Sequence, residues 1–544
     1  MLPRSILFFL MITVSQFSFA KETPNSSREF LSACAKASDC ELQFLFEIAK
    51  TYRPSKEEDE LRQYILAIKE TSEASFWNQK LETFQDKIGN LMIRIPGTGR
   101  HAQNKKITPF ALQSHMDMVL AYAKAKPGED VRPYFKNGVE LEIKDGWLQS
   151  KDSLTSIGVD NGIGVATALR YLIDPSIEHV PLELIFTVQE ETGLVGAFQA
   201  ELPIQSKKML CLDGMTPEPG YIIAGAQGSK SNLVEMATRG TETTTDQKTA
   251  LVRVTVTQLA GGHSGGDIHR NRLNAVQAFA QLTKFISSKV GFVGVRTVSI
   301  GDVGIYNKIP NLFQADLVIL QNSISKDLAY QIETYMKTMI AANEDDAKNA
   351  RVEVTLQNGD QEKYLSTSVD FTQSFIESLL AAPNGVIDHN DQFLNGVYNS
   401  NNLSFLEIKP EESQKELQIK FGHMTRGFDQ VRITEIAEQV VSSLQRTQSS
   451  QNFNAKQTGG YAPWIEPETS SLLQETLTVS GYFHKKFYLS GGLEPSAFKA
   501  KIQDLEVVAL GPFIQMAHSV NEKLKIDTIQ PTVQGVQNIV QHQK

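Results

Sequence analysis

Phe110-Ala111-Leu112-Gln113-Ser114-His115-Met116-Asp117-Met118-Val119 is an apolar run that ends in a histidine, with a carboxylate two residues later. Residues i and i+2 of an extended segment point to the same side, so His115 and Asp117 can face one site at the end of a buried strand. A carboxylate behind a metal-binding histidine fixes its tautomer and raises its basicity. A single pattern of this kind is more often a surface turn or a core histidine, so the metal interpretation depends on the rest of the chain.

Further carboxylates and a second histidine follow other strand-like stretches or turns. Glu190 and Glu191 follow the apolar run at residues 182–188, with Gln189 between. Neighbours on an extended backbone point in different directions, so one glutamate can bind metal while the other acts as a general base. The same set includes Asp160 in a glycine-rich turn, Asp213 after the apolar residues 208–212, and His518 far along the chain. Taken singly, the Asp160 segment is typical of an ordinary turn and the glutamate pair of a solvated charge run.

Together these side chains predict a centre with two divalent metal ions. Nitrogen and carboxylate donors suit Zn2+, which is the expected metal, although manganese or cobalt could occupy such a site. Paired metal ions activate a bridging water and also polarise a carbonyl group. The predicted chemistry is therefore metal-assisted hydrolysis.

The spacing of apolar residues predicts alternating strands and helices in the first part of the chain. Strands are expected over residues 90–95, 108–113, 182–188 and 208–212, and helices over residues 38–52, 56–74 and 158–172. Such alternation favours the α/β class, with a central, mostly parallel sheet flanked by helices. The candidate metal ligands follow the strands, where ligand sites of open α/β sheets lie.

A second pattern begins near residue 229. An alternating strand at residues 250–256, helices at 271–290, 326–342, 369–382 and 429–444, and a hairpin at 403–421 predict an inserted α+β lid domain. Residues 446–457 are rich in Ser, Gln and Asn and are expected to be a linker, and residues 123–152 are expected to be irregular. The predicted organisation is a signal peptide at 1–20, a catalytic domain at 27–228 and 449–544, and the lid at 229–448.

The N-terminal sequence predicts where the protein acts. Arg4, an apolar run at residues 6–14 and Ser18-Phe19-Ala20 predict a secretory signal peptide rather than an uncleaved anchor. We therefore expect an exported protein, periplasmic or secreted, with no membrane span after cleavage.

A net charge of −9 without a basic block argues against a nucleic-acid partner. Cys34 and Cys40 can form a disulfide or stay reduced, and Cys211 reads as a small buried side chain.

Four motifs resemble those of a known family, the aminoacyl-histidine dipeptidases, which belong to the dinuclear-zinc superfamily that includes carboxypeptidase G and the aminoacylases. They are Ser114-His115-Met116-Asp117-Met118-Val119, Gly158-Val159-Asp160-Asn161-Gly162-Ile163-Gly164, Glu190-Glu191-Thr192-Gly193 and Gly261-Gly262-His263-Ser264-Gly265-Gly266. The likeness runs in the same order from residue 42 to residue 526. It implies a metal-dependent dipeptidase with an inserted lid domain.

The resemblance also implies a role for each matched residue. Asp160 would bridge both metal ions. The ligands of one metal ion would be His115 and Asp213, and those of the other Glu191 and His518. Asp117 would orient His115, and Glu190 would be the general base. A cis peptide bond is implied between Asp160 and Asn161.

The lid positions match less closely. His263 is implied to bind substrate or the developing oxyanion, in many relatives across a homodimer, so a homodimer is a possible state of this chain. Asn401, Arg426 and Glu494 are placed among the substrate-binding residues. The family's serine after the arginine is Gly427 here, and Ser490 replaces the histidine of a histidine-alanine-glycine-leucine-glutamate motif. The secretion signal is a third departure, because these dipeptidases are mostly cytosolic.

The function predicted from the sequence is that of an exported metallopeptidase that hydrolyses dipeptides or short peptides, with Xaa-His dipeptides as candidates. Two alternatives share the scaffold, namely an N-acyl-amino-acid hydrolase and a non-catalytic binding protein. A third, a serine hydrolase with its nucleophile at Ser264, needs a helix directly behind the glycine-rich motif, but residues 267–271 intervene. The side-chain preference, the native metal and the oligomeric state stay open at this point.

Overall fold

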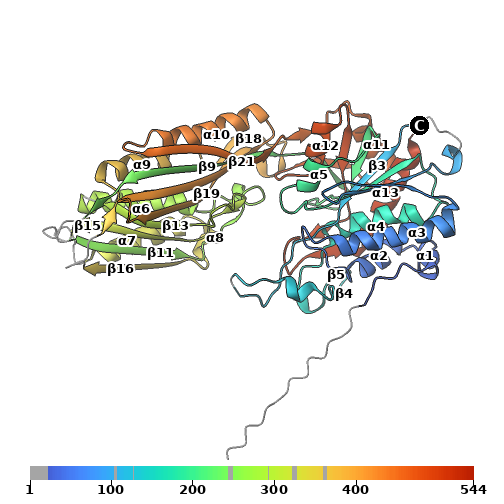
Figure 1. Cartoon of the computed structure of the whole chain (residues 1–544), viewed down its shortest axis with the longest axis horizontal. Coiled ribbons are helices and arrows are strands. Elements are labelled where there is room, and N and C mark those ends of the chain that lie inside the picture. Colours follow the sequence, from blue (N-terminus) through green and yellow to red (C-terminus); the bar gives the residue numbers. More distant parts are fainter. Residues whose placement is uncertain are drawn as a thin grey trace, which may run out of the picture.

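The computed structural model describes residues 22–543 except 103–106, 127, 243–248, 292, 321–326 and 359–363. The predicted signal peptide, residues 1–20, lies outside the described residues. Two lobes lie side by side (Figure 1). We call them the α/β lobe and the antiparallel lobe, after the sheets at their centres. In the described part of the chain, no helix is both long and apolar enough to cross a membrane.

The sheet of the α/β lobe is parallel at its centre and antiparallel toward its edges. Its strands run in the order β1 (Glu82–Gln85), β2 (Leu91–Ile95), β6 (Leu182–Thr187), β3 (Phe110–His115), β7 (Lys208–Cys211), β24 (Glu506–Ala509), β8 (Tyr221–Ala226) and β22 (Trp464–Ile465), and β23 (Lys485–Leu489) also pairs with β8. The contacts β6–β3, β3–β7 and β7–β24 are parallel. These central strands are buried on both sides, which explains their near-continuous apolar sequences.

Helices cover both faces of this sheet. Alternate strand residues point to opposite faces, so Leu112 packs in one core and Ala111 in the other. On the Leu112 side lie α1 (Arg28–Cys34), α2 (Cys40–Ile48), α3 (Asp59–Ser72), α4 (Val159–Ile173), α11 (Ser471–Val479) and α13 (Ile529–His542). On the Ala111 side lie α5 (Val195–Gln199) and α12 (Pro495–Lys501).

The sheet of the antiparallel lobe has the order β16 (Arg351–Asn358), β11 (Thr249–Thr257), β15 (Phe313–Leu320), β13 (Gly294–Ile300), β19 (Val397–Glu411), β20 (Glu416–Gly427), β9 (Gly228–Arg239) and β21 (Gln451–Tyr461), with β18 (Gly385–His389) beside β19. Its core includes residues of α6 (Ala275–Val290), α7 (Leu328–Ala341), α9 (Val369–Ala381) and α10 (Gln430–Gln445). The whole sheet comes from the chain between β8 and β22, so this lobe is an insertion. The predicted α/β class with an inserted α+β lid is confirmed, and the exact domain boundaries stay a prediction.

Two local expectations were wrong. Residues 446–457 are not a linker, because β21 pairs with β9 along the edge of the sheet. Most β21 side chains are exposed, which explains why its polar sequence resembles a linker. The region expected to be irregular contains β4 (Leu141–Lys144) and β5 (Trp147–Ser150), which form a small sheet with β26 (Lys523–Lys525) and β25 (Ile514–Gln515).

The structure shows the state of the cysteines, which the sequence left open. Cys34 and Cys40 form a disulfide. Cys211 is free and buried in β7, in agreement with its interpretation as a small core side chain.

Candidate active site

His115 is the last residue of β3 and is fully buried. Its Nδ1 lies 3.1 Å from the carbonyl oxygen of Asp117 and 3.4 Å from Oδ1 of the same residue. Its Nε2 is thereby directed to the opposite side, 3.1 Å from Oδ1 of Asp160 and 3.9 Å from Oδ2 of Asp213. The aspartate two residues after the histidine therefore lies behind the ring, and the free nitrogen faces other carboxylates.

Asp160 lies where the chain enters α4, on irregular backbone. Gly158 before it has a left-handed conformation, and Asp160 and Asn161 depart from helical angles. The implied cis peptide bond between Asp160 and Asn161 is present. Oδ1 of Asp160 faces His115, and Oδ2 lies 3.0 Å from Nε2 of His518. The carboxylate of Asp160 thus lies between two histidines that are 403 positions apart in the sequence.

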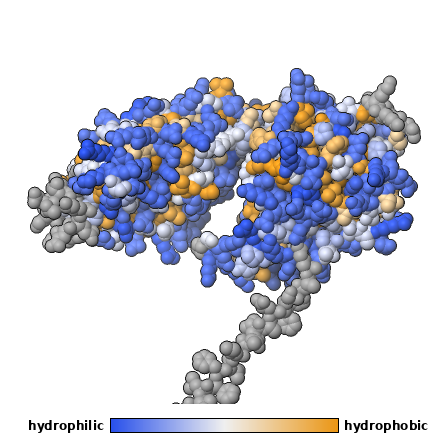
Figure 2. All heavy atoms as spheres, viewed as in Figure 1, coloured by the Kyte–Doolittle hydropathy of each residue, from blue (hydrophilic) through white to orange (hydrophobic). Residues whose placement is uncertain are grey.

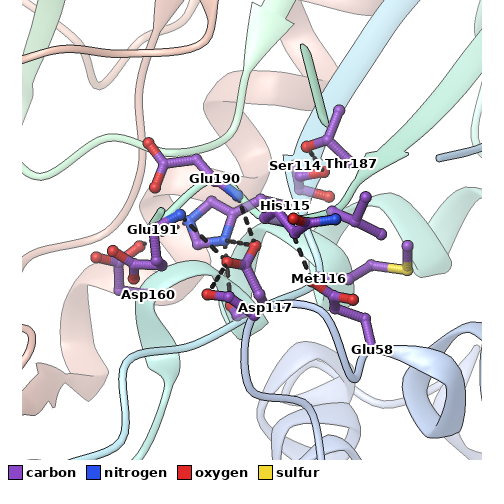
Figure 3. A network of polar contacts seen from close by, with 12 residues as sticks. Glu58, Ser114, His115, Met116, Asp117, Asp160, Thr187, Glu190 and Glu191 are labelled. Carbon is purple, nitrogen blue, oxygen red and sulfur yellow. Dashed lines mark hydrogen bonds and ion pairs between the residues drawn. The ribbon is translucent and has the colours of Figure 1, made fainter. Parts of the chain in front are cut away.

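Glu190 and Glu191 follow β6, the strand next to β3. The backbone N–H of Glu190 donates to Oδ1 of Asp117 at 3.0 Å, and that of Glu191 donates to Oδ2 at 3.1 Å. The hydroxyl of Ser55 also donates to Oδ2, at 2.7 Å. Figure 3 shows Asp117 at the centre of these contacts, beneath the His115 ring. Asp117 therefore fixes both the histidine and the start of the glutamate turn.

The structure brings all five predicted metal ligands together. Oε2 of Glu191 lies 2.9 Å from Nε2 of His518, while its buried Oε1 has no hydrogen-bond partner among the described residues. Three sets of donor atoms lie within 4.8 Å of one another: His115, Asp160 and Asp213; Asp160, Glu191 and His518; and His115, Glu190 and Glu191. The first two sets share Asp160. The donors are imidazole nitrogens and carboxylate oxygens, which fits two divalent cations of the zinc type.

The charges of the cluster act strongly on one another. Burial and the charge of Asp160 raise the pKa of Asp213 to about 8. Burial raises the pKa of Glu190 well above its usual value, and the charges of Glu191 and Asp213 raise it further. Partial burial lowers the pKa of His518, but its hydrogen bonds with Asp160 and Glu191 raise it to about 11 overall. A bound cation would reverse these pKa shifts, because it favours ionised carboxylates and neutral imidazoles.

His263 and Arg426 come from the antiparallel lobe and lie next to one another. The backbone N–H groups of Gly265 and Gly266 lie 3.3 and 3.1 Å from Nδ1 of His263. Since these groups can only donate, Nδ1 accepts and the neutral ring carries its proton on Nε2. Desolvation and the charge of Arg426 lower the pKa of His263 below its usual value, which favours the neutral ring. Its Nε2 lies 3.5 Å from Nη2 of Arg426, so both groups offer N–H to the same region.

Two residues predicted to bind substrate are enclosed by protein. Oδ1 of Asn401 accepts hydrogen bonds from His423 and Thr425, and its amide group donates to the carbonyl of Pro383. Oε2 of Glu494 accepts hydrogen bonds from Gln113 at 2.5 Å and Thr187 at 2.8 Å. The exposed fractions of the two residues are 1% and 0%. The structure therefore places Asn401 in the interior of the antiparallel lobe and Glu494 beneath the metal-ligand cluster.

Two contact residues were missed by sequence reasoning. Ser55, which donates to Asp117, follows Pro54 in a turn that carries no metal-binding signal. Tyr461, the last residue of β21, places its hydroxyl 3.2 Å from Nη1 of Arg426. It was missed because this segment was expected to lie beyond a linker. Tyr461 is brought to the site by the pairing of β21 with β9, and Ser55 by the packing of a turn that is distant from Asp117 in the sequence.

The fold and the donor cluster together define a metal-dependent hydrolase, and comparison with known proteins agrees. No family model matches the chain. The cytosol non-specific dipeptidase of Escherichia coli strain K12 is 28% identical over 490 residues, which cover 88% of this chain and 92% of that protein. The aminoacylhistidine dipeptidase of Vibrio alginolyticus has the same fold, with a TM-score of 0.70 and 23% identity over 95% of this chain and 99% of that one. The aminopeptidase PepT of Bacillus cereus superimposes with a TM-score of 0.55 and 15% identity over 93% and 99% of the two chains.

These matches confirm the resemblance to the aminoacyl-histidine dipeptidases that the motifs indicated. The chain is an enzyme of the peptidase class, as predicted. The same comparison corrects the predicted localisation: the relative that aligns with 88% of this chain is a cytosol enzyme, which contradicts an exported, periplasmic or secreted protein. The apolar run at residues 6–14 was therefore given too much weight.

Proposed function

We propose that this protein is a dipeptidase that uses two divalent metal ions, with Zn2+ as the expected metal. The observation that carries the proposal is the position of Asp160, whose two carboxylate oxygens face His115 and His518 separately. Asp213 completes the donor set on the His115 side and Glu191 the set on the His518 side. A shared carboxylate between two donor sets is the arrangement that a pair of metal ions requires.

The chain's own residues can move the protons of peptide hydrolysis. When bound, the cations would lower the pKa of water and polarise the substrate carbonyl. Glu190 accepts the proton of the attacking water and returns it to the leaving amine. A carboxylate suits both steps, because it can accept a proton from water and donate it to an amine. Asp117 keeps His115 in one orientation throughout.

The substrate assignment rests on the lid residues and on the relatives. The N–H groups of His263 and Arg426 point to one region and would bind a carboxylate or a developing oxyanion. A free carboxylate close to the cleaved bond is a feature of dipeptides. Two of the proteins that align along most of the chain are a non-specific dipeptidase and an aminoacylhistidine dipeptidase. Dipeptides are therefore the proposed substrates, with Xaa-His dipeptides among them.

A metal analysis combined with a substrate panel tests this proposal. The purified protein is expected to contain close to two equivalents of metal per chain and to hydrolyse dipeptides. Treatment with a chelator should abolish turnover, and Zn2+, Mn2+ or Co2+ should restore it. Turnover of N-acyl amino acids in preference to dipeptides would instead assign the chain to the N-acyl-amino-acid hydrolases. Dipeptide binding without turnover, at any metal concentration, would make it a non-catalytic relative.

A further inference from the structure

Arg53 is a buried arginine that joins two of the segments carrying candidate metal ligands. Its exposed fraction is 2%. Nη1 donates to the carbonyl oxygens of Met116 at 2.9 Å and Asp117 at 3.1 Å, directly after His115. Nη2 donates to the carbonyl oxygen of Gly158, two residues before Asp160. One guanidinium group therefore connects the end of β3 to the beginning of α4.

Glu522 holds the same α4 segment from its amide side. Its carboxylate accepts hydrogen bonds from the backbone N–H groups of Ile157 at 2.8 Å, Gly158 at 2.9 Å and Asp160 at 3.2 Å. It is also 2% exposed, and it lies four residues after His518 in the sequence. Glu522 thus connects the segment before Asp160 to the C-terminal loop that carries the second histidine.

The backbone at this position needs both partners. The first N–H groups of a helix have no acceptor within the helix. Because Asp160 and Asn161 depart from helical angles, the backbone N–H groups at the start of α4 need acceptors from outside the helix. The carboxylate of Glu522 supplies the acceptors. On the other side, a Cβ at Gly158 would lie 2.5 Å from Nη2 of Arg53, so the glycine allows the guanidinium to approach.

Neither side chain belongs to a donor set that could hold a metal ion. In the described part of the chain, the hydrogen bonds of both side chains go to backbone groups of residues 116–117 and 157–160. From this geometry we infer that Arg53 and Glu522 are positioning residues, which hold the Asp160 segment so that its two carboxylate oxygens face His115 and His518. They would therefore set the affinity of the metal centre without binding metal. The inference rests on the proposed function only in assuming that cations bind at these ligands.

Two substitutions remove these contacts with little change in shape, and two others serve as matched controls. Glu522→Gln turns one acceptor oxygen into an amide donor that opposes a backbone N–H. Arg53→Lys replaces the two nitrogens that donate to three carbonyls with a single nitrogen on a shorter side chain. Glu183 is a fully buried carboxylate in β6 that accepts from the backbone N–H groups of Gln205 and Ser206, so Glu183→Gln is the control for the glutamate. Arg170 donates to the carbonyls of Ala35 and Ala37, so Arg170→Lys is the control for the arginine.

The main readout is Zn2+ affinity, measured by competition with a chromogenic chelator on the full-length protein. Loss of a group that orients metal ligands typically weakens metal binding about 10- to 100-fold. We expect Zn2+ affinity to fall by that factor in Glu522→Gln and Arg53→Lys, and dipeptide turnover to recover as free Zn2+ is raised. The two control variants should keep the affinity of the wild type, even where they unfold at a lower temperature.

Each other outcome also decides the question. Folded Glu522→Gln and Arg53→Lys proteins with Zn2+ affinity within twofold of wild type would overturn the inference. If a variant folds only in excess Zn2+ while its control folds without it, the inference is supported. If a variant stays unfolded at every Zn2+ concentration, the substituted residue is needed only for folding and the inference is wrong. A wild-type protein that binds no Zn2+ would instead refute the proposed function.

Discussion

Glu190 and Glu191 are adjacent in the chain but differ in their contacts. Glu191 contacts His518, whereas no ion pair joins the carboxylate of Glu190 to either histidine in the described part of the chain. Glu190→Gln keeps the size of the side chain but cannot carry the proton. We expect kcat for dipeptides to fall about a hundredfold or more, with unchanged metal content. Steady-state kinetics and elemental analysis measure the two effects.

Glu191→Gln is the comparison for this substitution, because it should lose metal as well as activity. Glu190 also belongs to one of the three donor sets, and the metal content of its variant therefore separates the two roles. If Glu190→Gln loses one equivalent of metal, Glu190 is a ligand rather than the base.

His423 makes the antiparallel lobe sensitive to acid. It is fully buried, with Nδ1 3.0 Å from Oδ1 of Asn401 and Nε2 3.1 Å from the amide nitrogen of Asn232. The ring therefore donates to Asn401 and accepts from Asn232, which requires the neutral form. Burial and the charge of Lys230 lower its pKa to about 3. Below pH 6.5 the unfolded chain binds a proton that the folded chain does not, so this residue's contribution to stability is lost as the pH falls from 6.5 toward 3.

The loss amounts to about 2.3 kcal/mol between pH 6.5 and pH 4.5. An aspartate at position 232 could accept a hydrogen bond from the charged ring, so Asn232→Asp should reduce the acid dependence. Urea unfolding of both proteins at the two pH values measures the difference. An unchanged acid dependence in Asn232→Asp would show that His423 is not responsible.

At the scale of elements, the loop that carries His263 is braced by charged side chains. Asp267 accepts from the backbone N–H of His263 at 2.9 Å, and Arg272 donates to the carbonyl of Gly261 at 2.6 Å. Gly262 lies between them with φ +126°, and a Cβ there would come within 2.5 Å of Arg272 and 2.6 Å of Asp267. The glycine-rich sequence of this loop is therefore required for packing as well as for conformation.

Gly262→Ala should displace His263 and lower kcat/KM for dipeptides roughly tenfold to a hundredfold, because an error of 1 Å in a positioned group costs about that much. Metal content should stay at the wild-type level, since all candidate ligands lie in the other lobe. Gly459→Ala is the control, because a Cβ at that position in β21 would meet no atom of the described residues within 4 Å, its chain neighbours aside. Equal activity of the two variants would show that His263 takes no part in the reaction.

The elements also show what sequence reasoning could and could not predict. The buried strands β3, β6 and β7 are continuous apolar runs, so their positions and the site at their carboxyl ends were predictable. His518 was assigned to the same site because the motifs follow one another in the same order as in the family. Strand β21 was missed because most of its side chains are exposed and polar. Strands β4 and β5 were missed because each has only four residues, too few for a clear apolar pattern. Arg53 and Glu522 were missed for a different reason: their roles arise from backbone groups far away in the chain, which leave no pattern around them.

At the scale of the whole molecule, the two lobes have separate hydrophobic cores. One set of core residues lies around the parallel sheet and another around the antiparallel sheet. The chain passes between the lobes where β8 leads into β9 and where β21 leads into β22. Figure 2 shows both lobes largely hydrophilic on one face, with a hollow between them on its lower side. The lobes are therefore expected to unfold as two units.

All five candidate metal ligands belong to the α/β lobe, and this gives a prediction for the whole molecule. A ligand stabilises only the unit that binds it, by about 4 kcal/mol at a free concentration of 1,000 times Kd. At roughly 2 °C per kcal/mol for a unit of this size, Zn2+ should raise the midpoint of one calorimetric transition by about 8 °C and leave the other unchanged. Phe421→Ala, in the core of the antiparallel lobe, should lower only the transition that does not respond to Zn2+. Equal shifts of both transitions by Zn2+ would mean that the lobes unfold together and that the metal centre stabilises the whole chain.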